Sequence, residues 1–241
     1  MRAQPGVSCI IPFYNEGLRL FSILNVVTEL DSVSQIICID DGSTDDTSRL
    51  IKAKWPEIEV LRLEENEGKS QAVKHGLKLV KNEVILLLDA DLQDINKIEL
   101  ENAILPMLLN PHIDMIILRR VNAAWFVKID RADILLSGER IIKKKDLDEI
   151  FKNQVNGYQL EIAINTYMQQ GNKNVQWTAW SARNTYKTKK CGLIYGIIKE
   201  IQMFISIFSY AGISNFFKQF TSFAKKELEV EPLRSTYIRQ K

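Results

Sequence analysis

The chain has 241 residues, of which 46% are hydrophobic and 26% are charged, and its formal net charge is +2. This composition excludes a disordered chain and predicts a globular protein with one large domain, or a domain and an appendage. The charge is uneven, because residues 1–118 hold 11 Lys and Arg against 19 Asp and Glu, whereas residues 119–241 hold 21 against 11. An acidic first half suits a cation site, and a basic second half suits an acidic partner or an anionic membrane surface; an uneven solvated surface is the alternative.

Cysteine usage and the N-terminal sequence favour a cytoplasmic setting. Cys9, Cys38 and Cys191 form no close pair and no metal-binding spacing, and two of them fall in predicted buried strands. Reduced thiols are therefore expected. The opening residues, MRAQPGVSC, lack the apolar stretch of a signal peptide.

The first half alternates short apolar runs with helical patterns. Runs rich in Val, Ile and Leu predict strands buried on both faces at 7–13, 35–40, 58–63, 83–89 and 114–118. Apolar residues at helical spacing predict helices at 17–30, 44–54, 69–81 and 97–109. The second helix is expected to be capped by Ser43, with Asp45 and Asp46 in its first turn. This order predicts a doubly wound, mostly parallel sheet with right-handed crossovers.

The second half has a different rhythm. Residues 118–150 mix charged and aromatic residues without a strand pattern, 156–172 predict a helix closed by Gly171, and 173–182 alternate like a strand. An apolar helix is expected from 193 to about 226. Its longest uncharged run, between Glu200 and Lys218, has 17 residues, fewer than the roughly 20 needed to cross a bilayer.

The predicted tail has an amphipathic pattern. Phe216, Phe220 and Phe223 alternate with lysines in a way that suits a helix at a membrane interface. Packing on the remainder of the chain, or on a second subunit in a homo-oligomer, is the alternative.

Polar clusters follow three of the predicted strands, at the edge where such sheets bind ligands. The strands end in PFYNEG, DDGS and DADLQD. In the last cluster Asp89 and Asp91 carry like charges that repel unless a cation or a proton compensates. Carboxylate oxygens suit Mg²⁺ or Mn²⁺, and Gln93 could add an amide oxygen. A turn that uses aspartate only to cap its own backbone is the alternative.

Several other site types are excluded. EGKS at 67–70 lacks the earlier glycine of a phosphate-binding P-loop, because Leu63 stands there. The first strand is not followed by the dinucleotide-binding glycine pattern, and Asp94 occupies the place of the sharp-turn glycine of a calcium loop. His75 and His112 are isolated and are expected to be ordinary surface or packing residues.

Four motifs in this order resemble the family 2 glycosyltransferases, and most of all those that transfer mannose or glucose to dolichyl or polyprenyl phosphate. The motifs are SCIIPFYNEG, IDDGSTDDT, ENEGKSQAVKHGL and LLLDADLQD, and they cover about the first half of the chain. The resemblance implies the GT-A fold, a UDP- or GDP-sugar donor, a Mg²⁺ or Mn²⁺ cofactor, and inversion at the anomeric carbon. No nucleic-acid partner is expected.

The resemblance also implies roles for individual residues. The expected nucleotide-sugar contacts are Pro12, Tyr14, Asn15, Glu16, Asp40, Asp41, Gly42, Ser43, Asn66, Gly68, Lys69 and Asp89. Turn chemistry alone is the alternative reading of Pro12, Gly42 and Gly68. Asp89, Asp91 and Gln93 would hold the metal on the diphosphate, and Asp91 is therefore also counted as catalytic.

The basic second half is expected to bind the acceptor. Arg119, Arg131 and Arg140 can clamp a lipid phosphate through paired hydrogen bonds, although the lysines of IKKKD (142–146) are better explained as a solvated surface. LSGER (136–140) resembles a bacterial branch of these transferases and makes Glu139 a candidate base or sugar ligand. A helix-start pair with Arg140 or Lys143 is the alternative for Glu139. Glu161 is a weaker candidate for burial toward the site.

Two departures from the family pattern concern the metal and the acceptor. The usual proline-rich stretch after the metal motif is replaced by INK (95–97), and no histidine lies beyond residue 112. Asn184, Lys187 or Lys190 could face the diphosphate in place of that histidine.

We therefore expect a nucleotide-sugar half at 1–118, an acceptor half at 119–192 and an amphipathic helical tail at 193–241. The acceptor is expected to be a polyprenyl phosphate or another membrane-linked acceptor, at the cytoplasmic face of a membrane. A sugar hydroxyl of a glycan or glycolipid, or a non-catalytic nucleotide-sugar-binding scaffold, is the alternative.

Overall fold

The computed structural model describes residues 6–121, 132–153, 155, 159–184 and 223–228. Its strands are β1 (Val7–Phe13), β2 (Val33–Asp40), β3 (Glu59–Arg62), β4 (Val84–Leu87), β5 (Leu92–Gln93), β6 (Met115–Arg120), β7 (Arg140–Lys143), β8 (Val175–Trp180), β9 (Arg183–Asn184) and β10 (Lys226–Glu227). Its helices are α1 (Arg19–Val27), α2 (Thr47–Lys54), α3 (Lys69–Leu77), α4 (Lys97–Leu109), α6 (Ala132–Leu135), α7 (Lys144–Ile150) and α8 (Gln159–Gln170).

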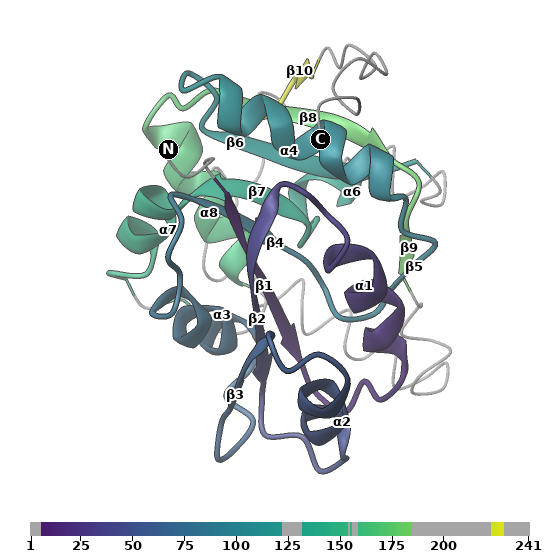
Figure 1. The fold of residues 1–241 in the computed structure, drawn as a ribbon. Coiled ribbons are helices and arrows are strands. Elements are labelled where there is room, and N and C mark those ends of the chain that lie inside the picture. The colour runs from purple at the N-terminus through teal and green to yellow at the C-terminus, as the bar shows by residue number, and fades with distance from the viewer. Residues whose placement is uncertain (1–5, 122–131, 154, 156–158, 185–222, 229–241) are drawn as a thin grey trace, which may run out of the picture.

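One mixed sheet runs through the molecule (Figure 1). Within the described ranges its strand order is β10-β8-β6-β7-β4-β1-β2-β3. Each neighbouring pair is parallel except the two that involve β7, which runs antiparallel to both β4 and β6. The doubly wound, mostly parallel sheet predicted from the sequence is thus confirmed, and both predicted halves of the chain contribute strands to it.

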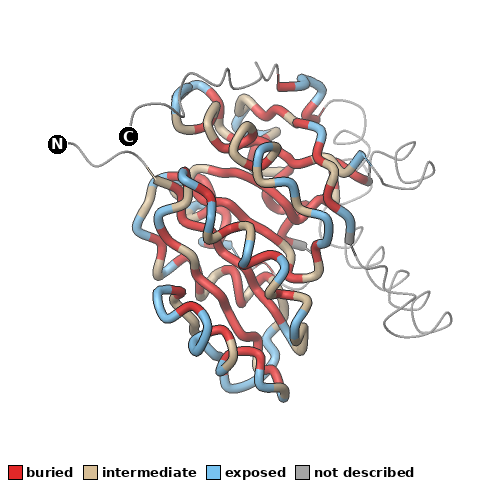
Figure 2. The backbone as a smooth tube through the Cα atoms, turned by 45° about the vertical axis from the view of Figure 1, so that its right-hand side comes forward, coloured by how far each residue is buried: buried red, intermediate tan, exposed pale blue. Residues whose placement is uncertain are grey.

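Helices cover both faces of this sheet. On one face α1, α2 and α4 bury apolar residues such as Leu24, Ile51 and Ile104. On the other face α3, α6, α7 and α8 bury a second set that includes Val73 and Ile164. Figure 2 shows the buried backbone in the centre and exposed residues on the outer turns of the helices. Burial on both faces explains why the first strands read as unbroken apolar runs.

The second helix begins later than predicted. Ser43 is not its cap, because α2 starts at Thr47, and no acidic residue lies in its first turn. Gly42 has a φ of 72°, which a right-handed helix does not permit, so the chain forms a loop between Asp40 and the helix. Ser43 is used within that loop, where its Oγ accepts a hydrogen bond from the Asn15 N–H at 2.9 Å.

The reading of 118–150 as lacking strands was wrong at β7. This strand lies between β4 and β6, where Leu87 is opposite Arg140 and Ile117 is opposite the same residue. Glu139 directly precedes β7, so its predicted alternative as a helix-start partner is also wrong. Because β7 is antiparallel, its first residues lie at the edge where the parallel strands end.

The described part of the predicted tail, residues 223–228, packs against the sheet. Phe223 is buried in the same core as α8, and Lys226 lies in β10 beside β8, so the predicted helix does not extend to residue 226. Phe216, Phe220 and the rest of 193–222 lie outside the described residues. In the part of the chain that the structure describes, no helix has both the length and the apolar character needed to cross a bilayer.

Candidate active site

The loops after β1 and β2 are tied together by Asn15. The Oδ1 of Asn15 accepts hydrogen bonds from the backbone N–H of Thr44 at 2.8 Å and of Asp45 at 3.3 Å. Asn15 has a φ of 53°, a conformation that asparagine tolerates better than most residues. The two loops that carry predicted nucleotide contacts are therefore joined to each other.

Three other predicted contacts lie in β1 or in the loop that follows it. Pro12 is buried at the end of β1, and Tyr14 is 45% exposed in the loop that follows. Glu16 forms an ion pair of 2.9 Å with Arg19 at the start of α1. Tyr14 thus offers an accessible aromatic ring, which suits stacking on a base.

The two adjacent aspartates after β2 have different surroundings. Asp40 is fully buried, and its carboxylate accepts hydrogen bonds from the Ser43 N–H at 2.7 Å and from the Ser48 hydroxyl. Asp41 accepts the backbone N–H groups of Glu67 at 2.8 Å and Gly68 at 2.9 Å. Burial raises the pKa of Asp41, although these two N–H groups act in the opposite direction. Asp40 therefore orders its own loop, whereas Asp41 holds the segment before α3.

That segment approaches the β2 loop closely enough to require glycine. A Cβ on Gly42 would lie 2.6 Å from the backbone carbon of Glu65 and 2.8 Å from the Asn66 nitrogen. Gly68, with a φ of 88°, precedes the first residue of α3, and Asn66 is exposed on the loop. The loop chemistry expected of Gly42 and Gly68 is thus present.

The turn after β4 carries the predicted metal ligands. Asp89 and Asp91 are each partly exposed, and Gln93 is exposed within β5. The short strand β5 pairs with β9, with Leu92 opposite Asn184. Residues 183–184 therefore lie beside the metal turn, while Lys187 and Lys190 lie outside the described residues.

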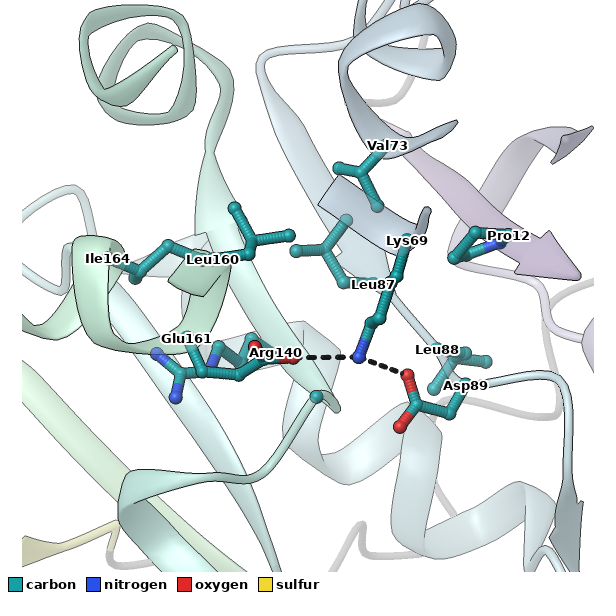
Figure 3. A pocket seen from close by; sticks show the side chains of 11 residues that line it. Pro12, Lys69, Val73, Leu87, Leu88, Asp89, Arg140, Leu160, Glu161 and Ile164 are labelled. Carbon is teal, nitrogen blue, oxygen red and sulfur yellow. Dashed lines mark hydrogen bonds and ion pairs between the residues drawn. The ribbon is translucent and has the colours of Figure 1, made fainter. Parts of the chain in front are cut away.

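Lys69 connects this turn to α8. Its Nζ lies 2.5 Å from Asp89 Oδ1 and 2.7 Å from Glu161 Oε1 (Figure 3). Burial lowers the pKa of Lys69, but the charges of Asp89 and Glu161 outweigh it and raise this pKa above its ordinary value. A Cβ on Gly138 would lie 2.4 Å from the same Nζ. The turn before β7 therefore approaches the ion pair at a residue without a side chain.

A pocket surrounds this ion pair. It is lined by Pro12, Lys69, Val73, Leu87, Leu88, Asp89, Gly138, Arg140, Leu160, Glu161 and Ile164. The lining combines an apolar wall with a few convergent charged groups, which is the usual character of a ligand site. Predicted residues from both halves of the chain thus meet here.

Glu139 lies fully buried in the turn before β7. Its Oε2 is 2.7 Å from the Ser137 hydroxyl, and its Oε1 has no hydrogen-bond partner among the described residues. Burial, and then the charge of Asp89, raise the pKa of Glu139 above its ordinary value. A buried carboxyl with a raised pKa and an unpartnered oxygen has the properties of a general base.

Arg140 lines this pocket, and its guanidinium is fully buried and bonded to neighbouring groups. It donates to the carbonyl oxygens of Ser137 at 2.8 Å and Leu135 at 3.1 Å, and to Asn165 Oδ1 at 2.7 Å. Burial lowers the pKa of Arg140 to about 10. These hydrogen bonds fix the turn that carries Glu139, so we propose a positioning role for Arg140, while its predicted acceptor contact stays a prediction.

The other predicted arginines are less similar to one another than the sequence suggested. Arg119 Nε donates to the buried carboxylate of Asp133 at 2.5 Å, and its guanidinium lies 4.9 Å from the centre of the Trp177 ring. Next to it, Arg120 has a buried Nε without a hydrogen-bond partner among the described residues. The charge of Arg120 offsets part of the rise in the pKa of Glu139. Arg131 lies outside the described residues.

The carboxylates after β4 fit a divalent ion that takes some of its ligands from the protein and the others from a substrate. Among the described residues, no three His, Cys, Asp or Glu side chains form a ready-made cage. Mg²⁺ commonly takes only one or two carboxylates from a protein and completes its shell with water and phosphate oxygens. Asp89 and Asp91, with the amide of Gln93, are such an incomplete set of hard oxygen ligands.

Sequence reasoning missed the supporting residues of the acceptor half. Ser137 and Gly138 lie within LSGER but were given no role there, Asn165 belongs to no motif, and the Lys69–Glu161 ion pair joins residues 92 positions apart. One signal was present: Glu161 and Asn165 are four residues apart, on one side of a helix that is otherwise apolar there.

Comparison with known proteins supports the likeness seen in the motifs. Residues 8–168, more than half of the chain, match the profile of glycosyl transferase family 2. Dolichyl-phosphate beta-glucosyltransferase of Dictyostelium discoideum is 37% identical over 111 residues, covering 39% of this chain and 34% of that protein. Undecaprenyl-phosphate 4-deoxy-4-formamido-L-arabinose transferase of Aeromonas hydrophila is 36% identical over 96 residues, covering 36% and 29% respectively. The matches span about a third of the length of these curated relatives.

A solved structure shows the same fold. Glucosyl-3-phosphoglycerate synthase of Mycobacterium tuberculosis, crystallised with Mn²⁺, uridine diphosphate and phosphoglyceric acid, aligns with a TM-score of 0.65 and 20% identity. The alignment covers 87% of this chain and 79% of that chain. The motifs, the sheet topology and the family match agree, and the chain belongs to glycosyl transferase family 2 and has the GT-A fold.

Proposed function

We propose that this chain is a metal-dependent inverting glycosyltransferase that moves a sugar from a UDP- or GDP-sugar to a polyprenyl phosphate or another membrane-linked acceptor. The observation that carries the proposal is the meeting of the β1, β2 and β4 loops with Lys69 at one edge of the sheet. Two of the relatives, the dolichyl-phosphate glucosyltransferase and the undecaprenyl-phosphate arabinose-derivative transferase, act on lipid phosphates, which supports a lipid acceptor. We further propose peripheral contact with the cytoplasmic face of a membrane.

On the donor side, the proposed role of the site is to hold a diphosphate and offset its charge. A divalent ion at Asp89 and Asp91 would act as a Lewis acid on the leaving group. Lys69 supplies a permanent cation beside that corner, and Asp41 fixes the 66–68 segment through two backbone hydrogen bonds. Tyr14 would stack on the base.

On the acceptor side, a phosphate needs cations rather than a base. A phosphate oxygen is already anionic near neutrality, so positioning by Arg119, Arg120 or Arg131 would be sufficient. This oxygen would form a bond to the anomeric carbon on the face opposite the diphosphate. The bond from that carbon to the diphosphate breaks, the diphosphate leaves with the electron pair, and the anomeric centre is inverted.

One observation favours transfer to a sugar hydroxyl as a second candidate. The buried Glu139 carboxyl, with its unpartnered Oε1, could accept the proton that an attacking hydroxyl must lose. Under this alternative Glu139 is a catalytic base, whereas with a phosphate acceptor it has no proton to remove.

The variant Glu139→Gln separates the two acceptors. With Mn²⁺ and labelled UDP- or GDP-hexoses, we expect transfer to polyprenyl phosphate, and we expect the Gln variant to retain that rate within about threefold. A base contributes roughly 10²–10⁴-fold to rate, so a loss of that size would show that a hydroxyl is the acceptor.

A donor-only reaction provides the control. Slow hydrolysis of the sugar donor that depends on Mn²⁺ or Mg²⁺ should occur without any acceptor. Nucleotide-sugar binding without hydrolysis or transfer would contradict the enzymatic function and indicate a binding scaffold.

A further inference from the structure

The ammonium of Lys69 occupies a position that a metal bound to Asp89 must share. Its Nζ is 2.5 Å from Asp89 Oδ1. The backbone at Gly138 lies close to the same pair, because a Cβ there would be 2.6 and 2.7 Å from the two Asp89 oxygens. The first carboxylate of the metal turn therefore already has a cation of its own.

This arrangement opposes the binding of a divalent ion by itself. An ion at Asp89 and Asp91 would place two positive charges next to an ammonium in a partly buried corner, where water screens charges weakly. The Lys69 side chain is 30% exposed and that of Asp89 is 24% exposed, so both charges are only partly hydrated. The ion would gain a carboxylate that the ammonium has to give up.

A diphosphate changes this balance. It brings negative charge to the metal and offers the ammonium new oxygen partners. Glu161, on the far side of Nζ at 2.7 Å, belongs to α8 and not to the metal turn. It can hold the ammonium in the pocket while Asp89 turns to the ion.

We propose, on the basis of the function proposed above, that Lys69 is a resident counter-cation of Asp89 that makes the divalent ion and the nucleotide diphosphate bind together. Lys69 is handed from Asp89 to the diphosphate, and Glu161 is a positioning residue that holds it during the exchange. By linkage, the diphosphate raises the affinity for Mn²⁺ and Mn²⁺ raises the affinity for the diphosphate by the same factor.

The test measures Mn²⁺ binding to the full chain without turnover. Binding is followed by the electron paramagnetic resonance signal of free Mn²⁺, with and without UDP or GDP. Lys69→Met is compared with Lys69→Arg, which keeps the positive charge, and with Lys78→Met, which removes one exposed lysine at the end of the same helix. Lys69→Gln keeps a hydrogen-bond donor between the two carboxylates and replaces the Met variant if that one does not fold.

We expect the wild type to bind Mn²⁺ weakly alone and at least about tenfold more tightly with the nucleotide, which lies within the usual range of coupling. Lys69→Met should bind Mn²⁺ alone about tenfold more tightly than Lys78→Met, and its coupling to the nucleotide should fall by a similar factor. Lys69→Arg should resemble the wild type.

Mn²⁺ affinity of Lys69→Met no higher than that of Lys78→Met would overturn the proposal while leaving the glycosyltransferase function intact. If UDP and GDP bind to no variant, both the proposed donor and the proposed transfer of the Lys69 ammonium from Asp89 to the diphosphate are wrong. A higher Mn²⁺ affinity in Lys69→Met would then show that only the competition at Asp89 remains.

Discussion

At the scale of single residues, burial divides carboxylates that look equivalent in the sequence. Asp40 and Asp41 are neighbours, yet one is bonded within its own loop and the other holds the segment before α3. Glu139 was recognised from a motif, but its full burial and its contact with Ser137 could not be read from that motif. Chemical identity is local, whereas the free energy of ionisation depends on everything that surrounds the group.

The raised pKa of Glu139 predicts a dependence of stability on pH. The folded protein holds this proton to a higher pH than the unfolded chain, so ionisation favours unfolding. In metal-free buffer, the unfolding free energy of the wild type should fall relative to Glu139→Gln as the pH rises above the ordinary value of 4.5. Urea unfolding at several pH values measures this difference. A difference that does not change with pH would show that Glu139 ionises normally.

At the scale of elements, β7 is a central strand that the sequence did not reveal. Only four residues long, it follows a charged segment and runs against its neighbours. Its reversed direction brings Glu139 and Arg140 to the edge where the parallel strands end. Arg140 then joins β7, the turn before it and α8 through three hydrogen bonds.

Arg140→Met should therefore destabilise the protein strongly. Each buried acceptor that loses its donor costs about 1–3 kcal/mol, so the loss of these three hydrogen bonds should lower the unfolding free energy by about 3 kcal/mol or more. Chemical denaturation monitored by circular dichroism measures the change. Arg49→Met, on an exposed helix surface, is the matched control and should leave the unfolding free energy near that of the wild type. Equal stability of the two variants would mean that Arg140 is not part of the framework.

At the scale of the whole molecule, residues 223–228 pack against the sheet. Phe223 is only 4% exposed and packs in the core formed by α3, α7 and α8, while β10 extends the sheet beside β8. The sequence pattern suits a membrane-interface helix at Phe223, with packing on the remainder of the chain or on a second subunit as the alternative. In the structure Phe223 packs on the remainder of the chain, as the alternative expected.

Phe223→Ala tests this packing. Truncating a buried phenylalanine costs about 3 kcal/mol or more, so the unfolding free energy should fall by that order. Leu109→Ala, at a position that is 79% exposed, should change it little. Unchanged stability of Phe223→Ala together with weaker binding to anionic liposomes would instead place this side chain against a membrane.

The sequence by itself determined the parallel part of the sheet and the edge at which the polar loops meet. Apolar runs of strand length and helical spacing are local signals, and the carboxyl ends of parallel strands meet at one edge, so the order of the elements was enough to bring the polar loops together. Only the tertiary structure decided that β7 is reversed, that Lys69 lies between Asp89 and Glu161, and that Arg140 is internal. These features depend on contacts between residues far apart in the chain, and no local periodicity records them.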